Sequence, residues 1–330
     1  MWRKLRHLLI FLLIILKEPN TPEAGCSCST STFCQIRPLW FTRRTPCCNC
    51  DGQNLTGIPP DLPENIAFLY LGNNKITSFP QNIPKSIGQL ELENNQIRSI
   101  PPGALSCLLQ LVELNLDKNG ITNVKPGTFS DHKMLYTVCL SSNNITEIQT
   151  GTFSNLPELK RLFLHDNQIN QIQPGAFLNL PKLWSLGLRS NRMTSIRPGT
   201  FTNLPKLEYL DLEANRLSVL PQSAHGMLPA GIRKIICFEK NPWQCDCRMR
   251  PFRLKMTGSA KFENKITCEH PAHLRGQKLK DINPEDLICK ETTASTLPFD
   301  SHTSSAVSTS SSFASTESTT SPTAHPLSYR

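Results

Sequence analysis

The chain lacks the short motifs that mark the common classes of enzyme. It contains no P-loop, no G-x-G-x-x-G dinucleotide motif, no H-E-x-x-H metalloprotease motif and no nucleophile elbow. Each of these motifs holds a phosphate, a metal ion or a nucleophile in a fixed geometry, so no catalytic residue can be singled out without them. We expect a protein that is not an enzyme and that uses no cofactor.

The N-terminus lacks an apolar run long enough to span a bilayer. Leu8–Leu16 is shorter than the roughly 20 residues that a transmembrane helix needs. Basic residues precede this run, and the small residues Ala24 and Gly25 follow it. This order is typical of a secretory signal peptide over residues 1–25, which predicts an extracellular, secreted protein. The alternative is an N-terminal membrane anchor.

Cysteine is scarce in the middle of the chain and concentrated at its two ends. Of the 13 cysteines, only Cys107, Cys139 and Cys237 are isolated. The two groups predicted to form disulfides are Cys26, Cys28, Cys34, Cys47, Cys48 and Cys50 near the N-terminus, and Cys245, Cys247, Cys268 and Cys289 near the C-terminus. Such clusters suit an oxidising compartment, where they stabilise small modules.

Strong charge is also missing. The formal charge of +9 falls to about +7 once the four bases and two acids of residues 1–25 are removed. We expect no nucleic-acid partner. The segment 246–290 is the basic part, which favours either an anionic partner or an ordinary solvated face.

The middle of the chain contains a repeat. The pattern L-x-x-L-x-L-x-x-N-x-L, with Ile, Val or Met at some leucine positions, occurs seven times between residues 66 and 217. The first spacing is 21 residues and the next five are 24. Seven copies identify a leucine-rich repeat array. We predict an α/β-type solenoid, namely a leucine-rich repeat horseshoe with a concave parallel β-sheet.

The spacing within each copy predicts its geometry. Two leucines two positions apart lie on one face of a short strand and enter the core. The Asn is expected to bond backbone groups of neighbouring turns, so that the amides form a ladder. Phenylalanines recur in the "PGTF" and "PGAF" turns and are expected to stack along the convex side at Phe129, Phe153, Phe177 and Phe201.

A solenoid exposes its apolar interior at both ends, so it needs capping modules. The sequence "NPWQCDC" begins a C-terminal cap over 233–290, whose simplest pairing is crossed, Cys245 with Cys268 and Cys247 with Cys289. The N-terminal cap spans 26–65, where adjacent Cys47 and Cys48 leave the pairing open. The seven repeats fill 66–232 between the two disulfide-bonded caps.

These two cysteine motifs resemble the caps of extracellular leucine-rich repeat proteins. The layout of signal, caps, 24-residue repeats and Ser/Thr-rich stalk is most similar to the variable lymphocyte receptors of jawless vertebrates and to similar receptors of invertebrate chordates. Two features depart from that pattern: Gln35 to Pro46 looks like an insertion in the N-terminal cap, and the chain ends in "AHPLSYR" without an apolar tail. The resemblance implies innate immune recognition of pathogens.

The segment 291–330 is rich in Ser, Thr and Pro and has almost no large apolar residues. It cannot bury enough surface to fold, which predicts a disordered, O-glycosylated stalk. The protein is then either secreted, or a fragment or splice form of a cell-surface protein.

The outward residues of the strands form the predicted binding surface, because curved solenoids use their concave face for ligands. Acids dominate repeats two and three, a basic and aromatic group forms the centre, and acids return on repeat seven. The residues predicted to bind a ligand are Phe68, Tyr70, Glu91, Glu93, Glu113, Asp117, Arg161, Phe163, His165, Arg189, Tyr209 and Asp211. Aromatic residues and arginine dominate binding hot spots, whereas a purely structural sheet needs only polar filler.

Three further features carry expectations. Asn54 and Asn144 begin N-glycosylation sequons. The run "CEHPAH" could supply zinc ligands with Cys245 and Cys247, but a secreted context favours disulfides, so we expect no metal. Cys139 is expected on the outward face of its strand without an intramolecular partner; it is either a shielded thiol or the site of a disulfide-linked homodimer.

The sequence therefore predicts a recognition protein that binds a protein or glycan ligand through its concave face. The ligand is either a microbial surface component or a host receptor or matrix protein, the second being the partner of an adhesion, matrix or signalling-modulator protein. These two functions share one scaffold, so the fold does not separate them.

Overall fold

The computed structural model describes residues 25–29, 46–130, 132–201, 203–220, 235–255 and 265–289. These residues lie in one compact unit, Met1–Cys289. The second unit, Lys290–Arg330, is outside the described residues, and with it the stalk expected over 291–330. The expected signal peptide lies outside them as well, except for Gly25.

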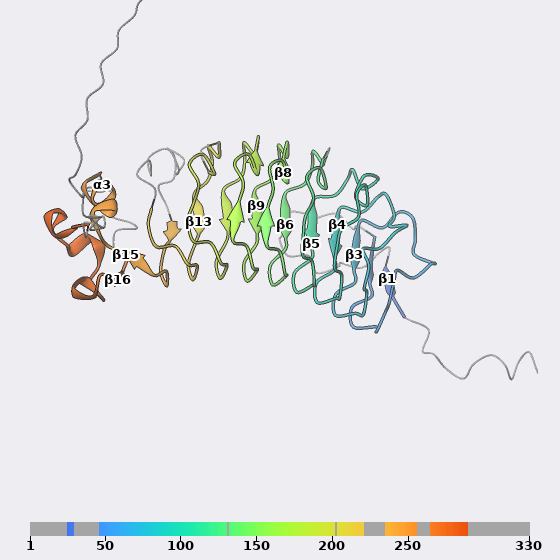
Figure 1. The fold of residues 1–330 in the computed structure, drawn as a ribbon. Coiled ribbons are helices and arrows are strands. Elements are labelled where there is room, and N and C mark those ends of the chain that lie inside the picture. The colour runs from blue at the N-terminus through green and yellow to red at the C-terminus, as the bar shows by residue number, and fades with distance from the viewer. Residues whose placement is uncertain are drawn as a thin grey trace, which may run out of the picture. The chain divides into compact units, whose positions relative to one another are not determined.

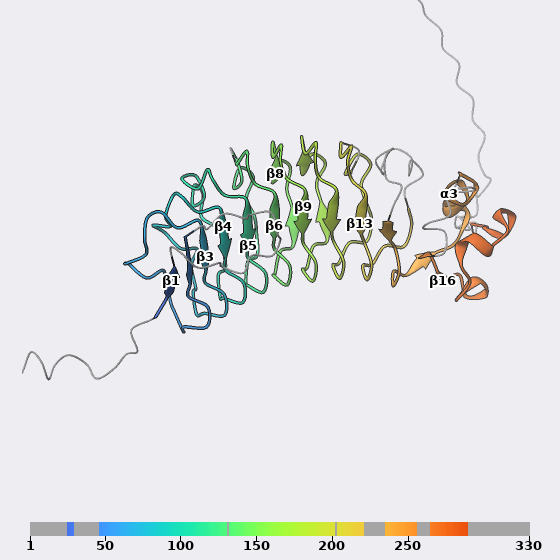
Figure 2. The same cartoon turned by 180° about the vertical axis from the view of Figure 1, so that it is seen from behind.

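A ten-stranded sheet runs along this unit (Figures 1 and 2). Its three-residue strands, in spatial order, are β1 (Ser27–Ser29), β2 (Cys47–Asn49), β3 (Phe68–Tyr70), β4 (Gln89–Glu91), β5 (Glu113–Asn115), β6 (Thr137–Cys139), β9 (Arg161–Phe163), β12 (Ser185–Gly187), β13 (Tyr209–Asp211) and β14 (Ile235–Cys237). β1 pairs antiparallel with β2, and every later pair is parallel and in register. The predicted leucine-rich repeat solenoid is therefore the observed fold.

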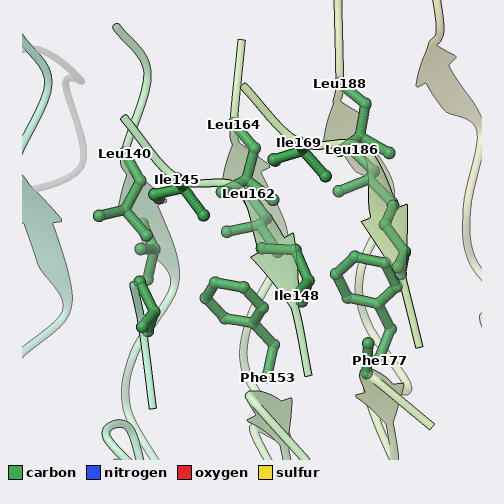
Figure 3. Close-up of a cluster of buried hydrophobic side chains, with 14 of the residues drawn as sticks. Leu140, Ile145, Ile148, Phe153, Leu162, Leu164, Ile169, Phe177, Leu186 and Leu188 are labelled. Carbon is green, nitrogen blue, oxygen red and sulfur yellow. The ribbon is translucent and has the colours of Figure 1, made fainter. Parts of the chain in front are cut away.

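The leucines of the repeat form the core. From β3 to β14, the middle residue of each strand of this sheet and the apolar residue two positions later are buried, as Leu162 and Leu164 show with 0% exposure. Figure 3 shows these side chains stacked on their counterparts in the neighbouring turns, such as Leu140 and Leu188. Burying one such side chain stabilises the fold by about 1.5–3 kcal/mol, so each turn is held by its neighbours.

The predicted asparagine ladder is present. Asn167 donates from Nδ2 to the carbonyl oxygens of Leu140, Leu164 and His165, and its Oδ1 accepts from the amide of Ile145. The same pattern recurs at Asn74, Asn95, Asn119, Asn143, Asn191 and Asn215. It continues to Asn241 in the C-terminal cap, which forms an eighth rung.

The other side of the solenoid is made of turns and short strands. Two parallel pairs lie there, namely β7 (Glu147–Ile148) with β10 (Gln171–Ile172) and β8 (Phe153–Ser154) with β11 (Phe177–Leu178). The predicted phenylalanine stack is present, with ring centroids 5.4 Å apart for Phe129 and Phe153 and 6.1 Å apart for each later pair. The helices of the described residues lie in the C-terminal cap, so the described parts of the repeats contain none.

Disulfides close both ends. Cys26 bonds to Cys50 and Cys28 to Cys48 in the N-terminal cap, where Cys47 is also disulfide-bonded. Cys34 lies outside the described residues. The C-terminal cap has the crossed pairing expected from the sequence, Cys245 with Cys268 and Cys247 with Cys289.

The C-terminal cap covers the last rung with short elements. These are β15 (Trp243–Gln244), η1 (Cys247–Met249), α3 (Arg250–Lys255), β16 (Cys268–His270), η3 (Ala272–Leu274), η4 (Leu279–Asp281) and η5 (Pro284–Asp286). Trp243 is 1% exposed, meets Phe238 edge-on, and donates from Nε1 to the carbonyl oxygen of Phe238 at 3.0 Å. This ring seals the apolar interior at the end of the array.

Candidate ligand-binding face

Three residues of each rung project from the side of the sheet opposite the leucine core. They are the first and third residues of the strand and the residue two positions beyond it, and we call the surface they form the sheet face. In rung order its described members are Phe68, Tyr70, Gly72; Gln89, Glu91, Glu93; Glu113, Asn115, Asp117; Thr137, Cys139, Ser141; Arg161, Phe163, His165; Ser185, Gly187, Arg189; Tyr209, Asp211, Glu213; Cys237 and Glu239.

All twelve residues predicted to bind a ligand lie on this face. The ten that are half-buried or exposed are Tyr70, Glu91, Glu93, Glu113, Asp117, Arg161, Phe163, His165, Arg189 and Tyr209. The expected exposure is wrong for Phe68 and Asp211, each of which is only 4% exposed. Phe68 is paired with Cys47 of the N-terminal cap, and Asp211 accepts hydrogen bonds from the Tyr209 hydroxyl at 3.2 Å and the Glu213 amide at 3.1 Å.

Rungs two and three hold four carboxylates. We call them the acidic cluster, and its members are Glu91, Glu93, Glu113 and Asp117. Glu93 lies over Gly72 of the preceding rung, where an added Cβ would be 2.6 Å from its Oε1. Gln89 donates to Glu91 at 2.6 Å, and the Ser141 amide donates to Asp117 at 2.5 Å. The carboxylates are thus held in place by the sheet rather than extended into solvent.

Burial and mutual repulsion raise the pKa values of three members of this cluster, Glu93, Glu113 and Asp117. Burial, with the charge of Glu91 added, raises the pKa of Glu113 to about 7, against the opposing effect of Arg161. Burial raises the pKa of Glu93 to about 6, with Glu91, Asp51 and Asp117 adding to it. Burial also raises the pKa of Asp117. The cluster is therefore costly to ionise without a cation.

The centre of the face is basic and aromatic. Arg161 lies over the ring of Tyr136, with Cζ 5.2 Å from the centroid, and Lys160 lies 4.7 Å from the same centroid. Phe163 and His165 stack at 5.7 Å. The Nε of Arg161 and the Nδ1 of His165 are buried without a hydrogen-bond partner. These two atoms are enclosed by the protein, so a ligand would meet the exposed parts of the two side chains.

His165 occupies space that a glycine leaves open. An added Cβ on Gly187 would lie 2.1 Å from its Cε1, so only glycine allows the imidazole to lie across the next rung. Burial there lowers the pKa of His165, against the charge of Asp211. The imidazole is therefore neutral at physiological pH and can accept or donate a hydrogen bond.

The C-terminal end of the face has its charges paired. Glu213 contacts Arg189 at 3.2 Å and Lys240 at 2.9 Å, and Glu239 contacts Lys265 at 3.0 Å. The hydrogen bond from Lys240, followed by the charges of Arg189 and Lys240, holds the pKa of Glu213 below its usual value. This end can offer little net charge to a ligand.

The three isolated cysteines are free thiols in different settings. Cys139 and Cys237 occupy the same column of the sheet face, four rungs apart, and both are half-buried. Burial, with Asp117 and Glu113 adding to it, raises the pKa of the Cys139 thiol far above its usual value. Cys107 is exposed and lies outside the sheet face. Of the three, Cys107 is the accessible thiol.

Two other sequence predictions concern N-glycosylation and zinc binding. The side chains of Asn54 and Asn144 are both exposed, which N-glycosylation requires. The disulfides of Cys245, Cys247 and Cys268 use the thiols that a zinc site with "CEHPAH" would need.

Three members of the sheet face shape it while offering little or no side chain to a ligand. Thr137 is 2% exposed and its Oγ1 has no hydrogen-bond partner. Sequence reasoning missed the other two: Gly72 makes room for the side chain of Glu93 in the following rung, and Gly187 makes room for His165 in the preceding rung. The available signal was the glycine itself, at a column position that carries side chains in other rungs.

Comparisons with known proteins agree with this architecture. The leucine rich repeat family matches residues 64–121, 133–193 and 185–228, and the leucine rich repeat C-terminal domain family matches residues 265–290. Human 5T4, also named Wnt-activated inhibitory factor 1 and trophoblast glycoprotein, has a solved structure that matches with a TM-score of 0.57 at 26% identity. The match covers 74% of this chain and 95% of that chain.

The similarity to curated sequences is local. Trophoblast glycoprotein of Macaca fascicularis is 36% identical over 56 residues, which are 16% of this chain and 13% of the relative. Trophoblast glycoprotein of Homo sapiens is 34% identical over 56 residues, again 16% of this chain and 13% of the relative. The chain thus matches only about an eighth of the length of these relatives.

No helix in the described part of the chain combines the length and apolar character needed to cross a membrane. The repeats, the disulfide-bonded caps and the matched families lead to one conclusion. The chain is a leucine-rich repeat protein of the extracellular type that carries a leucine-rich repeat C-terminal domain and is similar to trophoblast glycoprotein.

Proposed function

We propose that this protein acts outside the cell and binds a protein ligand through the sheet face. One observation carries the proposal: the centre of the face holds Arg161, Phe163 and His165 half-exposed side by side on a rigid parallel sheet. Arginine and aromatic residues dominate binding hot spots, and a rigid scaffold lowers the entropy cost of ordering them on binding. The disulfides at both ends suit an extracellular site of action.

We favour a host signalling protein as the ligand. The similarity to human 5T4, whose name includes Wnt-activated inhibitory factor, supports a role as a signalling modulator at the cell surface. That structural match covers 74% of this chain, and the leucine rich repeat family matches the rungs from β3 to β13. An adhesion or matrix ligand would use the same surface.

Innate immune recognition is the second candidate, and the resemblance to variable lymphocyte receptors supports it. A microbial glycan or lipopolysaccharide is anionic or rich in hydroxyl groups, and Arg161 and Arg189 on the sheet face would meet it.

The test is a binding screen with the mature protein as an oligomeric probe. The probe is presented to a panel of host receptor ectodomains, to matrix proteins, to whole bacteria and to purified lipopolysaccharide. A ligand of the sheet face should lose at least tenfold in affinity with Arg161→Glu and with Phe163→Ala, and should be unaffected by Lys133→Glu on an exposed turn outside the face. Binding that survives both face variants but is lost with Lys133→Glu would overturn the proposal. Selective binding to lipopolysaccharide rather than to host ectodomains would favour the immune role.

A further inference from the structure

We propose that the acidic cluster on rungs two and three, with Tyr70 at its edge, seats a basic segment of a protein ligand that inserts Lys or Arg side chains. The inference rests on the proposed function, because it assumes that the ligand meets the sheet face. It goes beyond that function by assigning the chemistry of the contact at one end of the face.

The carboxylates at the two ends of the sheet face differ in whether they form ion pairs. At the C-terminal end Glu213 and Glu239 are each paired with a basic side chain of this chain, at 2.9–3.2 Å and 3.0 Å. Within the described residues no member of the acidic cluster has such an ion pair. Arg161 and Lys118 act on Glu113 and Asp117 only at longer range. The acidic cluster therefore lacks the counter-charge that the other end supplies for itself.

The cluster is also held in position before any ligand arrives. Glu93 lies in the space above Gly72, and Asn115 donates to its Oε2 at 3.5 Å. The amide of Ser141 fixes Asp117 from the following rung. Side chains already ordered by the sheet lose little rotamer entropy when a cation binds, which makes a fixed carboxylate a better partner than a mobile one.

A buried group without a partner lies beside the cluster. Thr137 pairs with Glu113 in the sheet register, is 2% exposed, and has an Oγ1 that meets no donor or acceptor. A buried hydroxyl without a partner destabilises the protein, so a ligand group that donates to it would be favoured there. An ammonium or guanidinium group that displaces the side chains above it could donate to Thr137 Oγ1 and to Glu113 at once.

The spacing of the carboxylates favours several basic side chains of one segment over a single metal ion. Among the described residues, the only group of three or more ligating side chains whose ligand atoms converge is Asp246, Cys247 and Cys289, and its cysteines form a disulfide. The acidic cluster is not such a group, whereas Ca²⁺ needs six to eight oxygens at about 2.3–2.6 Å. Several basic side chains in one segment can each meet one carboxylate, and the ring of Tyr70 offers a cation–π contact.

The test measures binding of a fluorescein-labelled peptide of alternating Arg and Gly by fluorescence anisotropy, at pH 7.4 and 0.15 M salt. The wild-type mature protein should bind it, and a peptide of alternating Glu and Gly should not bind. The double variant Glu91→Gln, Glu93→Gln should weaken binding at least tenfold. The matched control, Glu213→Gln with Glu239→Gln, removes the same charge from the same face and should change the affinity less than twofold, because those acids are already paired.

Three results would overturn the proposal. One is no binding by wild-type protein whose fold is intact by circular dichroism. The second is an equal loss in the two double variants, which would reduce the effect to net charge. The third is tighter peptide binding after Arg37→Gln, Arg43→Gln and Arg44→Gln, since the occupant would then be this chain's own segment 30–45. If the peptide fails to bind while Arg161→Glu still abolishes binding of a ligand from the screen, this inference falls and the proposed function stands.

Discussion

At the scale of single residues, the chemistry of the sheet face is set by neighbours one rung away. Glu113 and Glu213 are both glutamates on the outward side of a strand or just beyond it, yet the pKa of the first is raised and that of the second is lowered. The difference arises because Glu113 is buried beside Glu91, whereas Glu213 contacts two cations. Substitutions at these positions should therefore differ in sign.

Glu113→Gln should stabilise the protein at alkaline pH. The unfolded chain loses the Glu113 proton near the ordinary pKa of 4.5, whereas the folded protein keeps it up to about pH 7. Between these values the folded state binds more protons, so the free energy of unfolding falls as pH rises and stays lower above pH 7. Because the group is partly exposed, we discount the effect for solvent screening and expect about 1–2 kcal/mol of added stability at pH 8 and almost none at pH 4.

Urea denaturation of wild-type and variant protein at both pH values measures this effect. Glu158→Gln is the control, since Glu158 forms an exposed ion pair with Lys182 and should shift stability by less than about 1 kcal/mol. An equal gain for Glu113→Gln at pH 4 and pH 8 would show that packing, not ionisation, is responsible.

The free thiols should react in the order of their exposure. Cys107 is exposed, whereas Cys139 is half-buried and its pKa is raised, so the attacking thiolate is rarely formed there. Alkylation of the folded, non-reduced protein at pH 7.5 should label Cys107 at least tenfold faster than Cys139, as mass spectrometry of tryptic peptides can show.

A disulfide-linked dimer on a non-reducing gel should then survive Cys139→Ser and disappear with Cys107→Ser. Loss of the dimer with Cys139→Ser alone would instead favour the second alternative for Cys139, a disulfide-linked homodimer through this residue.

At the scale of the repeat element, most of the structure could be predicted from the spacing of a few residue types. The role of each leucine, ladder asparagine and turn phenylalanine depends on its position within the repeat. The same role therefore recurs in every copy. The face could be predicted only as a set of outward positions. Whether Phe68 or Thr137 is exposed depends on side chains about 20 residues away, and no rule of spacing encodes their contacts.

The ladder should be the most sensitive polar element. Asn167→Ala leaves the buried amide of Ile145 without its acceptor, and it removes one of the two donors to each of the three carbonyl oxygens that the amide group meets. An unsatisfied buried group costs about 1–3 kcal/mol and a lost hydrogen bond about 0.5–1.5 kcal/mol, and the effects are not fully additive, so we expect a loss of about 2–4 kcal/mol in the free energy of unfolding.

Asn170→Ala, three positions further along, is the matched control because its side chain is exposed. It should cost less than about 0.5 kcal/mol. Urea denaturation of both variants compares the two positions directly. If they destabilise the protein equally, the ladder does not have the role that its hydrogen bonds indicate.

At the scale of the whole solenoid, stability is shared between neighbouring turns. Each rung from β3 to β13 has a neighbour on both sides, and the last rungs depend on the C-terminal cap. The sequence predicted that a cap was needed and predicted its crossed disulfides, because the cysteine spacing is local. The cap strand that holds Cys237 adds an eighth rung, whose Asn241 belongs to both the ladder and the "NPWQCDC" motif.

Removing the Cys247–Cys289 bridge should unfold the array from its C-terminal end. The bridge closes a loop of 42 residues, for which chain entropy gives a stabilisation of about 4 kcal/mol. Without it, the cap that holds Trp243 against Phe238 loosens, and the buried apolar side chains of β13 and β14 lose their cover. In a near one-dimensional array this loss acts first on adjacent rungs and weakens with distance.

Hydrogen exchange of the Cys247→Ser, Cys289→Ser variant should therefore show lost protection at β13 and β14, with β4 to β6 unchanged under mild conditions. Uniform loss of protection along all rungs would instead mean that the solenoid unfolds as one cooperative unit. The C-terminal cap would then stabilise every rung of the sheet face equally, whatever its distance from the cap.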